Sequence, residues 1–441
     1  MNRPSGLTIS FALLVVLIAA APVFALSAGR VTPQLVSLVA AILLVLLPSA
    51  PGVDVKRSSS IFKPLVVAML LPAGWMLLQI VPLPSGSIEH PIWHSAAMAL
   101  SEPLSGHISV DLGFTLRALF GYFGLVALTF VTAVFTRNRE RAEVILFTLC
   151  AITTFIAIEL MLFRDLTVLK PAYTTGDLTS SLVAIAAFGV ILNLAFVLRA
   201  VERYETRAQR QGQSLRAFIS MMLLGTAAAA ICLSALISSS TYDVLMAMAF
   251  GLVVLGLVIL LRRLSLGRWT AVTVGAAVLV VCGGVIALRF AANTSVSPLF
   301  RFAKFESAEA IAATLRMIAD ANWVGGGVGT YQALATIYRD ADGAPGQAAI
   351  NTIASILLEW GRVGFLVLIL SGLQLWTVLF RGALARGRDS FYAAAAAACL
   401  VTAVCEAYCD ASFTAITVQM LAAIVVGLGL AQTTGGRASS V

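Results

Sequence analysis

Long apolar runs separated by short polar segments dominate the pattern of residues along this chain. A helix that crosses the hydrocarbon core of a bilayer needs about 20 mostly apolar residues, and this pattern predicts an all-α membrane protein with about twelve transmembrane helices. The runs predicted as spans are Leu7–Ala28, Leu35–Ala50, Leu65–Pro82, Phe114–Phe135, Glu143–Phe163, Ser181–Leu198, Phe218–Ser238, Val244–Leu261, Thr270–Leu288, Val363–Phe380, Tyr392–Tyr408 and Phe413–Ala431. The first run is alternatively a cleaved signal peptide, but its length favours a retained span.

Two segments between the predicted spans are longer than a connection between helices requires. They cover residues 83–113 and 289–362. Because long loops usually carry function, the chain divides into spans one to nine with a short outer loop (1–288), a long helical outer loop (289–362), and spans ten to twelve with a tail (363–441).

Composition supports this membrane assignment. Hydrophobic residues make up 60% of the chain and charged residues only 11%, whereas soluble domains average about 25% charged residues. The mean hydropathy of +0.96 excludes a water-soluble fold, because surface-to-volume scaling leaves too few interior positions for so many apolar side chains.

The net charge of +8 predicts an orientation in the membrane. With a cytoplasmic N-terminus, the cytoplasmic segments hold 19 of the 29 Lys and Arg residues and six acids, which gives +13 on that side and −5 elsewhere. Positive charge collects on the cytoplasmic side of membrane proteins. Both termini are therefore predicted to be cytoplasmic, and contact with membrane lipids explains the basic balance without a nucleic-acid partner.

The segment 289–362 carries most of the candidate chemistry. Apolar residues recur every three or four positions from Phe300 to Ile318 and predict one amphipathic helix, with Arg301 and Lys304 one turn apart on a common face. A glycine-rich stretch, Trp323–Tyr331, follows it. Glycines permit positive φ, so the stretch is either a tight turn or a loop whose backbone N–H groups meet phosphate oxygens. Residues Gln347 to Glu359 then predict a helix that ends before Gly361.

Other polar residues near the spans have a structural and a functional interpretation. Ser238–Asp243 is either a capped hairpin or a hydroxyl-lined cavity edge. Ionisable residues within spans usually face the protein interior. The candidates are Arg117, Glu159, Glu359 and Glu406. The pairs Cys405/Cys409 and His90/His94 supply too few ligands for zinc, so no metal site is predicted.

Several motifs resemble the O-antigen ligase family of bacterial membrane proteins. The third predicted span and the segment 83–113 are similar to the first outer loop of that family, and the glycine-rich stretch and the helix after it are similar to its later motifs. The stretches that carry the resemblance are Trp75–Pro84, Pro91–Trp93, Pro103–Gly106, Ile108–Asp111, Thr115–Leu119, Met317–Asp320, Gly325–Tyr331, and Asn351 with Leu357, Glu359, Gly361 and Gly364.

The resemblance implies a GT-C-like glycosyltransferase of the bacterial inner membrane. Such enzymes take a glycan from an undecaprenyl-pyrophosphate carrier at the periplasmic face, without metal or cofactor. They transfer it to lipid A-core or to a growing polysaccharide chain. Arginine suits a pyrophosphate leaving group, and the acceptor hydroxyl needs a base. The candidate catalytic residues are Arg301, Lys304, Asp340 and Glu359, and the candidate substrate-binding residues are Arg117, Arg316, Arg339, Gly325, Gly327, Gly329, Tyr331 and Asn351.

The sequence departs from the family pattern at polar positions. Ile350 stands where the family has a histidine, and Thr241 stands where it has an arginine. Two alternatives therefore stay open. Twelve spans with a basic loop after the sixth also fit a flippase or secondary transporter. The missing histidine and arginine also fit a catalytically inactive member that acts as a scaffold.

Overall fold

The computed structural model describes residues 6–27, 31–47, 62–84, 88–166, 176–208, 215–239, 242–263, 298–303, 308–338, 349–385 and 389–433. These residues are almost entirely helical, and the described ranges contain no strand beyond an isolated bridge between Leu83 and Gly106. Among them, nine helical segments are long and apolar enough to cross a membrane. The chain is therefore an all-α, multi-pass membrane protein.

Eleven of the predicted spans coincide with described helices; Thr270–Leu288 lies outside the described residues. Two of the eleven helices, α3 and α18, are apolar but shorter than the other nine. The helices of the bundle are α1 (Gly6–Ala19) with α2 (Ala21–Leu26), α3 (Val31–Leu46), η2 (Lys63–Leu65) with α5 (Val66–Ile80), α7 (Leu112–Phe135), α8 (Arg139–Leu166), α9 (Gly176–Ala208), α10 (Leu215–Ser238), α11 (Tyr242–Arg263), α16 (Gly361–Ala385), α17 (Ser390–Cys409), and η4 (Ser412–Thr414) with α18 (Ile416–Ala431).

Helices α9 and α17 form the centre of the bundle. Both are buried over most of their length, whereas α10 and α16 are largely exposed, as expected for helices that face lipid. Helix α17 packs against α11, α18, α16 and α9. Its middle is a run of six buried alanines, Ala393–Ala398, and Gly251 and Gly429 of the neighbouring helices lie directly against it. Small residues let helix backbones approach closely, which is how helices gain contact within a membrane.

A cluster of ion pairs joins the helices at the start of α17. Glu143 of α8 pairs with Arg199 of α9 at 2.6 Å and also with Arg203. Arg139 bridges Glu143 and Asp389, which immediately precedes α17. These ion pairs bring the residues together at one end of the bundle. The charge pattern of the sequence assigns all of them to the cytoplasmic side.

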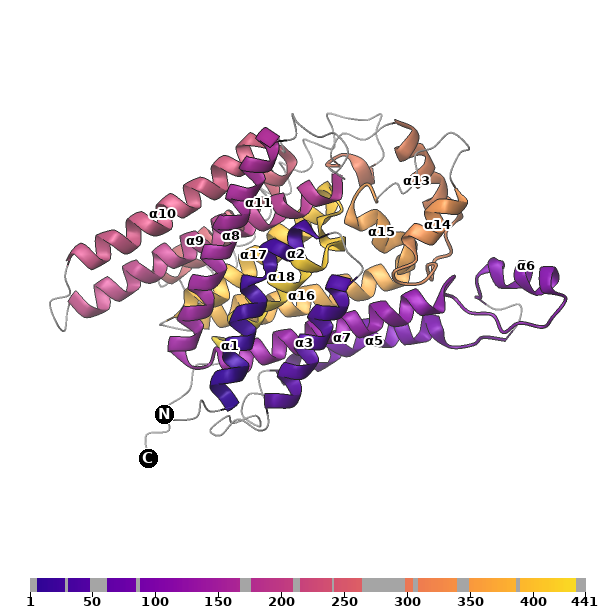
Figure 1. The fold of residues 1–441 in the computed structure, drawn as a ribbon, viewed down its shortest axis with the longest axis horizontal. Helices are drawn as coiled ribbons and strands as arrows, with labels where there is room; N and C mark the ends of the chain where they lie inside the picture. The colour runs from indigo at the N-terminus through magenta and orange to yellow at the C-terminus, as the bar shows by residue number, and fades with distance from the viewer. Residues whose placement is uncertain are drawn as a thin grey trace.

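The remaining helices gather at the opposite end of α17. They are α6 (Pro91–Leu100), η3 (Pro298–Phe300), α13 (Ala308–Asp320), α14 (Tyr331–Ile337) and α15 (Thr352–Glu359). Figure 1 shows α13, α14 and α15 grouped beside the ends of α5, α7 and α16, with α6 projecting beyond them. We call this end the head; it comprises the described residues of 81–111 and 298–360. The two long segments between spans therefore lie on the same side of the bundle.

Two expected helices of the head start later than the sequence predicts. The helix predicted from Phe300 is described from Ala308 onward as α13, residues 304–307 lie outside the described residues, and Arg301 lies in a turn after η3. Arg301 is therefore not part of an amphipathic helix. The helix predicted from Gln347 begins at Thr352, because the Asn351 side chain accepts a hydrogen bond from Ala354 N at 2.8 Å and caps it there.

The ion-pair cluster generates a stability prediction. Arg199 is buried, so Glu143→Gln leaves its guanidinium without its carboxylate partner. Removing one member of a buried pair costs about 3–5 kcal/mol. We expect a clear fall in the midpoint of thermal unfolding of the detergent-solubilised protein. The control is Glu140→Gln, an exposed acid on the same helix, which should change stability by about 0.5 kcal/mol or less. Equal midpoints for both variants would contradict the buried pairing.

Candidate functional site

The glycine-rich stretch forms an irregular loop against the ends of the membrane helices. Gly325, Gly327 and Gly329 have φ of 85°, 104° and 86°, and Gly361 after α15 has φ of 69°. These glycines thus use the positive φ that their lack of a side chain permits. A β-carbon on Gly325 would overlap the backbone at Glu359–Gly361, and one on Gly327 would overlap Ser109. These glycines let the loop lie directly on its neighbours.

The backbone N–H groups of this loop are taken up by the protein itself. Gly326 N donates to Leu358 O at 2.8 Å, and Gly327 N donates to Glu359 O at 3.0 Å. Val328 N donates to the Gln79 side chain at 3.2 Å. These N–H groups point at the protein's own acceptors and not outward to a phosphate, so the tight-turn interpretation fits the geometry.

Gln79 of α5 connects the loop to the membrane helices. Its side chain is fully buried. Besides accepting from Val328 N, its Nε2 donates to Val324 O at 3.2 Å and to Glu359 O at 3.0 Å. One amide thus satisfies polar backbone groups of the loop and of the end of α15. Nearby, Trp75 Nε1 of α5 donates to Trp360 O at 2.9 Å.

The segment before α7 is fixed to the same place. Ser109 N donates to Gln79 O at 3.1 Å, and Val110 N donates to Gly326 O at 2.8 Å. His107 Nδ1 donates to Ile80 O at 2.8 Å, which holds this buried imidazole in a structural role. The two long segments between spans therefore meet at the glycine loop and form one folded unit.

Glu359 lies beneath the loop at the end of α15. Its carboxylate accepts Tyr331 N at 3.0 Å and also the N–H of Gly329. Burial raises the pKa of Glu359 to about 7, and the two N–H donors oppose that rise. Glu359 and the predicted residues Gly325, Gly327, Gly329 and Tyr331 are thus brought together. Tyr331 itself is buried in an apolar cluster with Met317 and Leu358.

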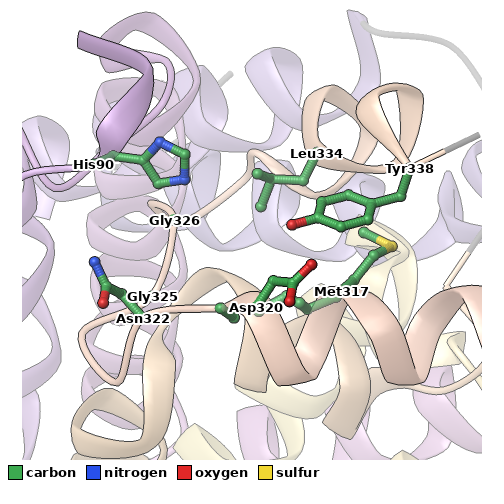
Figure 2. A pocket seen from close by; sticks show the side chains of 10 residues that line it. His90, Met317, Asp320, Asn322, Gly325, Gly326, Leu334 and Tyr338 are labelled. Atoms are coloured by element: carbon green, nitrogen blue, oxygen red, sulfur yellow. The ribbon is translucent and has the colours of Figure 1, made fainter. Parts of the chain in front are cut away.

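A pocket opens between the two segments of the head, beside the glycine loop. Its empty space, including the part open to solvent, is about 320 Å³. His90 lies on one side and Asp320 and Tyr338 on the other, as Figure 2 shows. Further lining residues are Met317, Ala321, Asn322, Gly325, Gly326, Leu334 and Leu358.

The pocket contains groups suited to proton transfer. Ile92 N donates to His90 Nδ1 at 3.3 Å, so the neutral ring carries its proton on Nε2. Burial lowers the pKa of His90, which keeps the ring neutral near pH 7. The Tyr338 hydroxyl donates to the Asp320 carboxylate; burial, then the charge of Asp320 and this hydrogen bond, raise the pKa of Tyr338. An imidazole N–H donor and a carboxylate acceptor therefore share one polar opening.

The remaining predicted site residues are dispersed. Arg117 is exposed on α7, 5.7 Å over the Phe114 ring. Arg316 is exposed on α13, one turn before Asp320. Asn351 is fully buried and has a structural role, because besides capping α15 it donates to Leu299 O and Tyr408 O. Lys304, Arg339 and Asp340 lie outside the described residues.

Sequence reasoning missed Gln79 and the combination of His90, Asp320 and Tyr338. A glutamine within a predicted span was a usable signal, since a polar side chain there needs a partner. The pocket residues gave no such signal, because they come together only when two distant segments meet.

The chain matches no protein-family model and no curated protein sequence.

Gln79→Ala should loosen the head. It removes partners from the buried Val328 N and from Val324 O, and each buried polar group left unpaired costs about 1–3 kcal/mol. We expect a lower thermal midpoint and faster protease cleavage within the head. Gln332→Ala, at an exposed position of α14, is the control and should behave like the wild type. A Gln79 variant as stable and as resistant as that control would rule out the bridging role.

Glu359 predicts a pH dependence of stability. Its ordinary pKa is 4.5 and its folded pKa about 7, so between these values the folded protein holds a proton that the unfolded chain has released. The contribution to stability is complete below about pH 4.5 and is lost as the pH rises through 7, by about 3 kcal/mol in total. Thermal unfolding of wild type and Glu359→Gln from pH 5 to 8 should show a steeper fall in the wild type. Parallel curves would contradict the shifted pKa.

Proposed function

We propose that the chain is an inner-membrane glycosyltransferase of the O-antigen ligase or polymerase type. In this proposal the bundle has twelve spans with both termini in the cytoplasm, and the head faces the periplasm. The enzyme transfers or polymerises a glycan from an undecaprenyl-pyrophosphate carrier. The acceptor is lipid A-core or a growing polysaccharide chain.

The observation that supports this proposal most is the pocket between the two segments of the head. It lies at the end of a bundle of apolar helices and holds a neutral imidazole and a carboxylate. A hydroxyl acceptor needs a base that removes its proton as the glycosidic bond forms. The Asp320 carboxylate is the group of the pocket that can accept this proton, whereas His90, whose Nδ1 accepts Ile92 N, presents its Nε2–H as a hydrogen-bond donor to the substrate.

The lipid pyrophosphate leaving group requires positive charge. Arg316 lies one turn before Asp320 on α13, and side chains four residues apart on a helix share a face. Among the predicted cations within the described residues, Arg316 therefore shares a helix face with the pocket residue Asp320 without itself lining the pocket, and its forked donors suit a phosphate. Arg301, after η3, is the second candidate.

The test compares polysaccharide made by a deletion strain that carries variants of the protein. Asp320→Asn should reduce polymer or ligated product by about 10²–10⁴-fold, the range for loss of a general base, and His90→Ala should reduce it less, because it removes a hydrogen-bond donor. The matched control is His94→Ala, at an exposed position of α6 on the same segment, which should leave the product unchanged. Normal product from both pocket variants, at wild-type protein levels, would refute the proposal and favour a scaffold.

A further inference from the structure

A second buried polar group lies inside the bundle, near the head end of α17. Glu406 is fully buried, and neither of its carboxylate oxygens has a hydrogen-bond partner among the described residues. The buried hydroxyls of Thr402, one turn earlier, and of Ser412, in the following η4, also have no partner in the described part of the chain. Unpaired polar atoms on a buried helix face are unusual, because most buried polar atoms in proteins are hydrogen-bonded.

The charged and titratable groups around Glu406 are acids and thiols. Asp410, four residues after Glu406 and immediately after the end of α17, interacts electrostatically with the Glu406 carboxyl group. Cys409 lies within electrostatic range of both acids and of Cys405. Asp243, at the start of α11, is also within range of Cys409. Cys399, two turns before Glu406 on α17, interacts electrostatically with Glu406. The neighbours from η4 and α15 contact Asp410, whose carboxylate accepts Ser412 N at 2.9 Å and whose main-chain oxygen accepts Thr352 Oγ1. Within the described residues, no Lys, Arg or His balances Glu406.

The position restricts what Glu406 can bind. An ionised carboxylate without a partner is strongly disfavoured in an apolar interior. A divalent metal needs several converging ligands, and no group of three or more His, Cys, Asp or Glu residues in the described ranges can hold one. A proton needs only one lone pair of the carboxylate.

We propose that Glu406 is a proton-binding site within the membrane bundle, which holds its proton at neutral pH and is coupled to the head through Asp410. The coupling follows from the contacts at the end of α17. Thr352 donates through both its N and its Oγ1 to Asp410 O, each at 2.9 Å, and Asn351 Nδ2 donates to Tyr408 O at 3.0 Å. The start of α15 is thus fastened to α17 within about one turn of Glu406.

Loss of the proton would place two negative charges one helical turn apart at this joint. Like charges at this spacing repel each other, so the end of α17 and the attached start of α15 should loosen. The other end of α15 carries the Glu359 carboxylate and the carbonyl groups of Leu358 and Glu359, which accept hydrogen bonds from N–H groups of the glycine loop and of Tyr331. The proton on Glu406 therefore stabilises α15, and through α15 the glycine loop that borders the pocket.

Infrared spectroscopy of the full chain in lipid vesicles tests the proton site. At pH 7 the wild type should show the carbonyl band of a protonated buried carboxyl group, and Glu406→Gln should lose it. Glu359→Gln identifies any contribution of Glu359, and Glu102→Gln, at an exposed position of the head, is the matched control and should retain the band. A wild-type spectrum that Glu406→Gln leaves unchanged would overturn the proposal.

Hydrogen exchange of α15 tests the coupling separately. The experiment uses the Glu359→Gln background, so that Glu359 does not contribute to the pH response. Raising the pH until the infrared band disappears should speed exchange in α15, after correction for intrinsic rates, while the additional Glu406→Gln change should abolish this response. The same response with and without Glu406 would overturn the coupling. Sodium that removes the band at constant pH would identify a cation site and overturn the assignment to a proton.

Discussion

An irregular loop can rest on the end of a membrane bundle only if its polar backbone groups find partners inside the protein. In this chain the buried Gln79 side chain meets that requirement. It binds Val324 O, Val328 N and Glu359 O at once. This one side chain therefore links the glycine loop to the end of α15, and the main-chain carbonyl of the same residue accepts Ser109 N from the segment before α7.

This arrangement separates support from chemistry. The glycine loop, Glu359 and Asn351 direct their polar atoms into the protein, so they fix the shape of the head. The pocket beside the loop carries the polar groups that remain available to a substrate, the Nε2–H of His90 as a donor and the Asp320 carboxylate as an acceptor. Charge is concentrated at the opposite end of α17, where Glu143 and its arginines tie α8 and α9 together.

Much of the fold follows from the sequence, because the length of an apolar run is a local property. The bundle helices were predictable for that reason, whereas the glycine-rich stretch indicated only that positive φ was permitted there. The head was less so. The start of α15 depends on the Asn351 cap, and the N–H groups of the loop find acceptors on Leu358, Glu359 and Gln79. The pocket brings together His90 and Asp320 from two segments far apart in the chain. The spacing of apolar residues within either segment does not predict that the two segments meet.

The central claim is that the glycine loop is a buried, internally bonded support. Hydrogen exchange of the wild-type protein in lipid tests it most directly, at the amides of Gly326, Gly327, Val328 and Tyr331. Each of these N–H groups has an acceptor within the protein, so all four should exchange far more slowly than their intrinsic rates, although they lie outside regular helices or at the start of one. Exchange near the intrinsic rate at these amides would contradict the account.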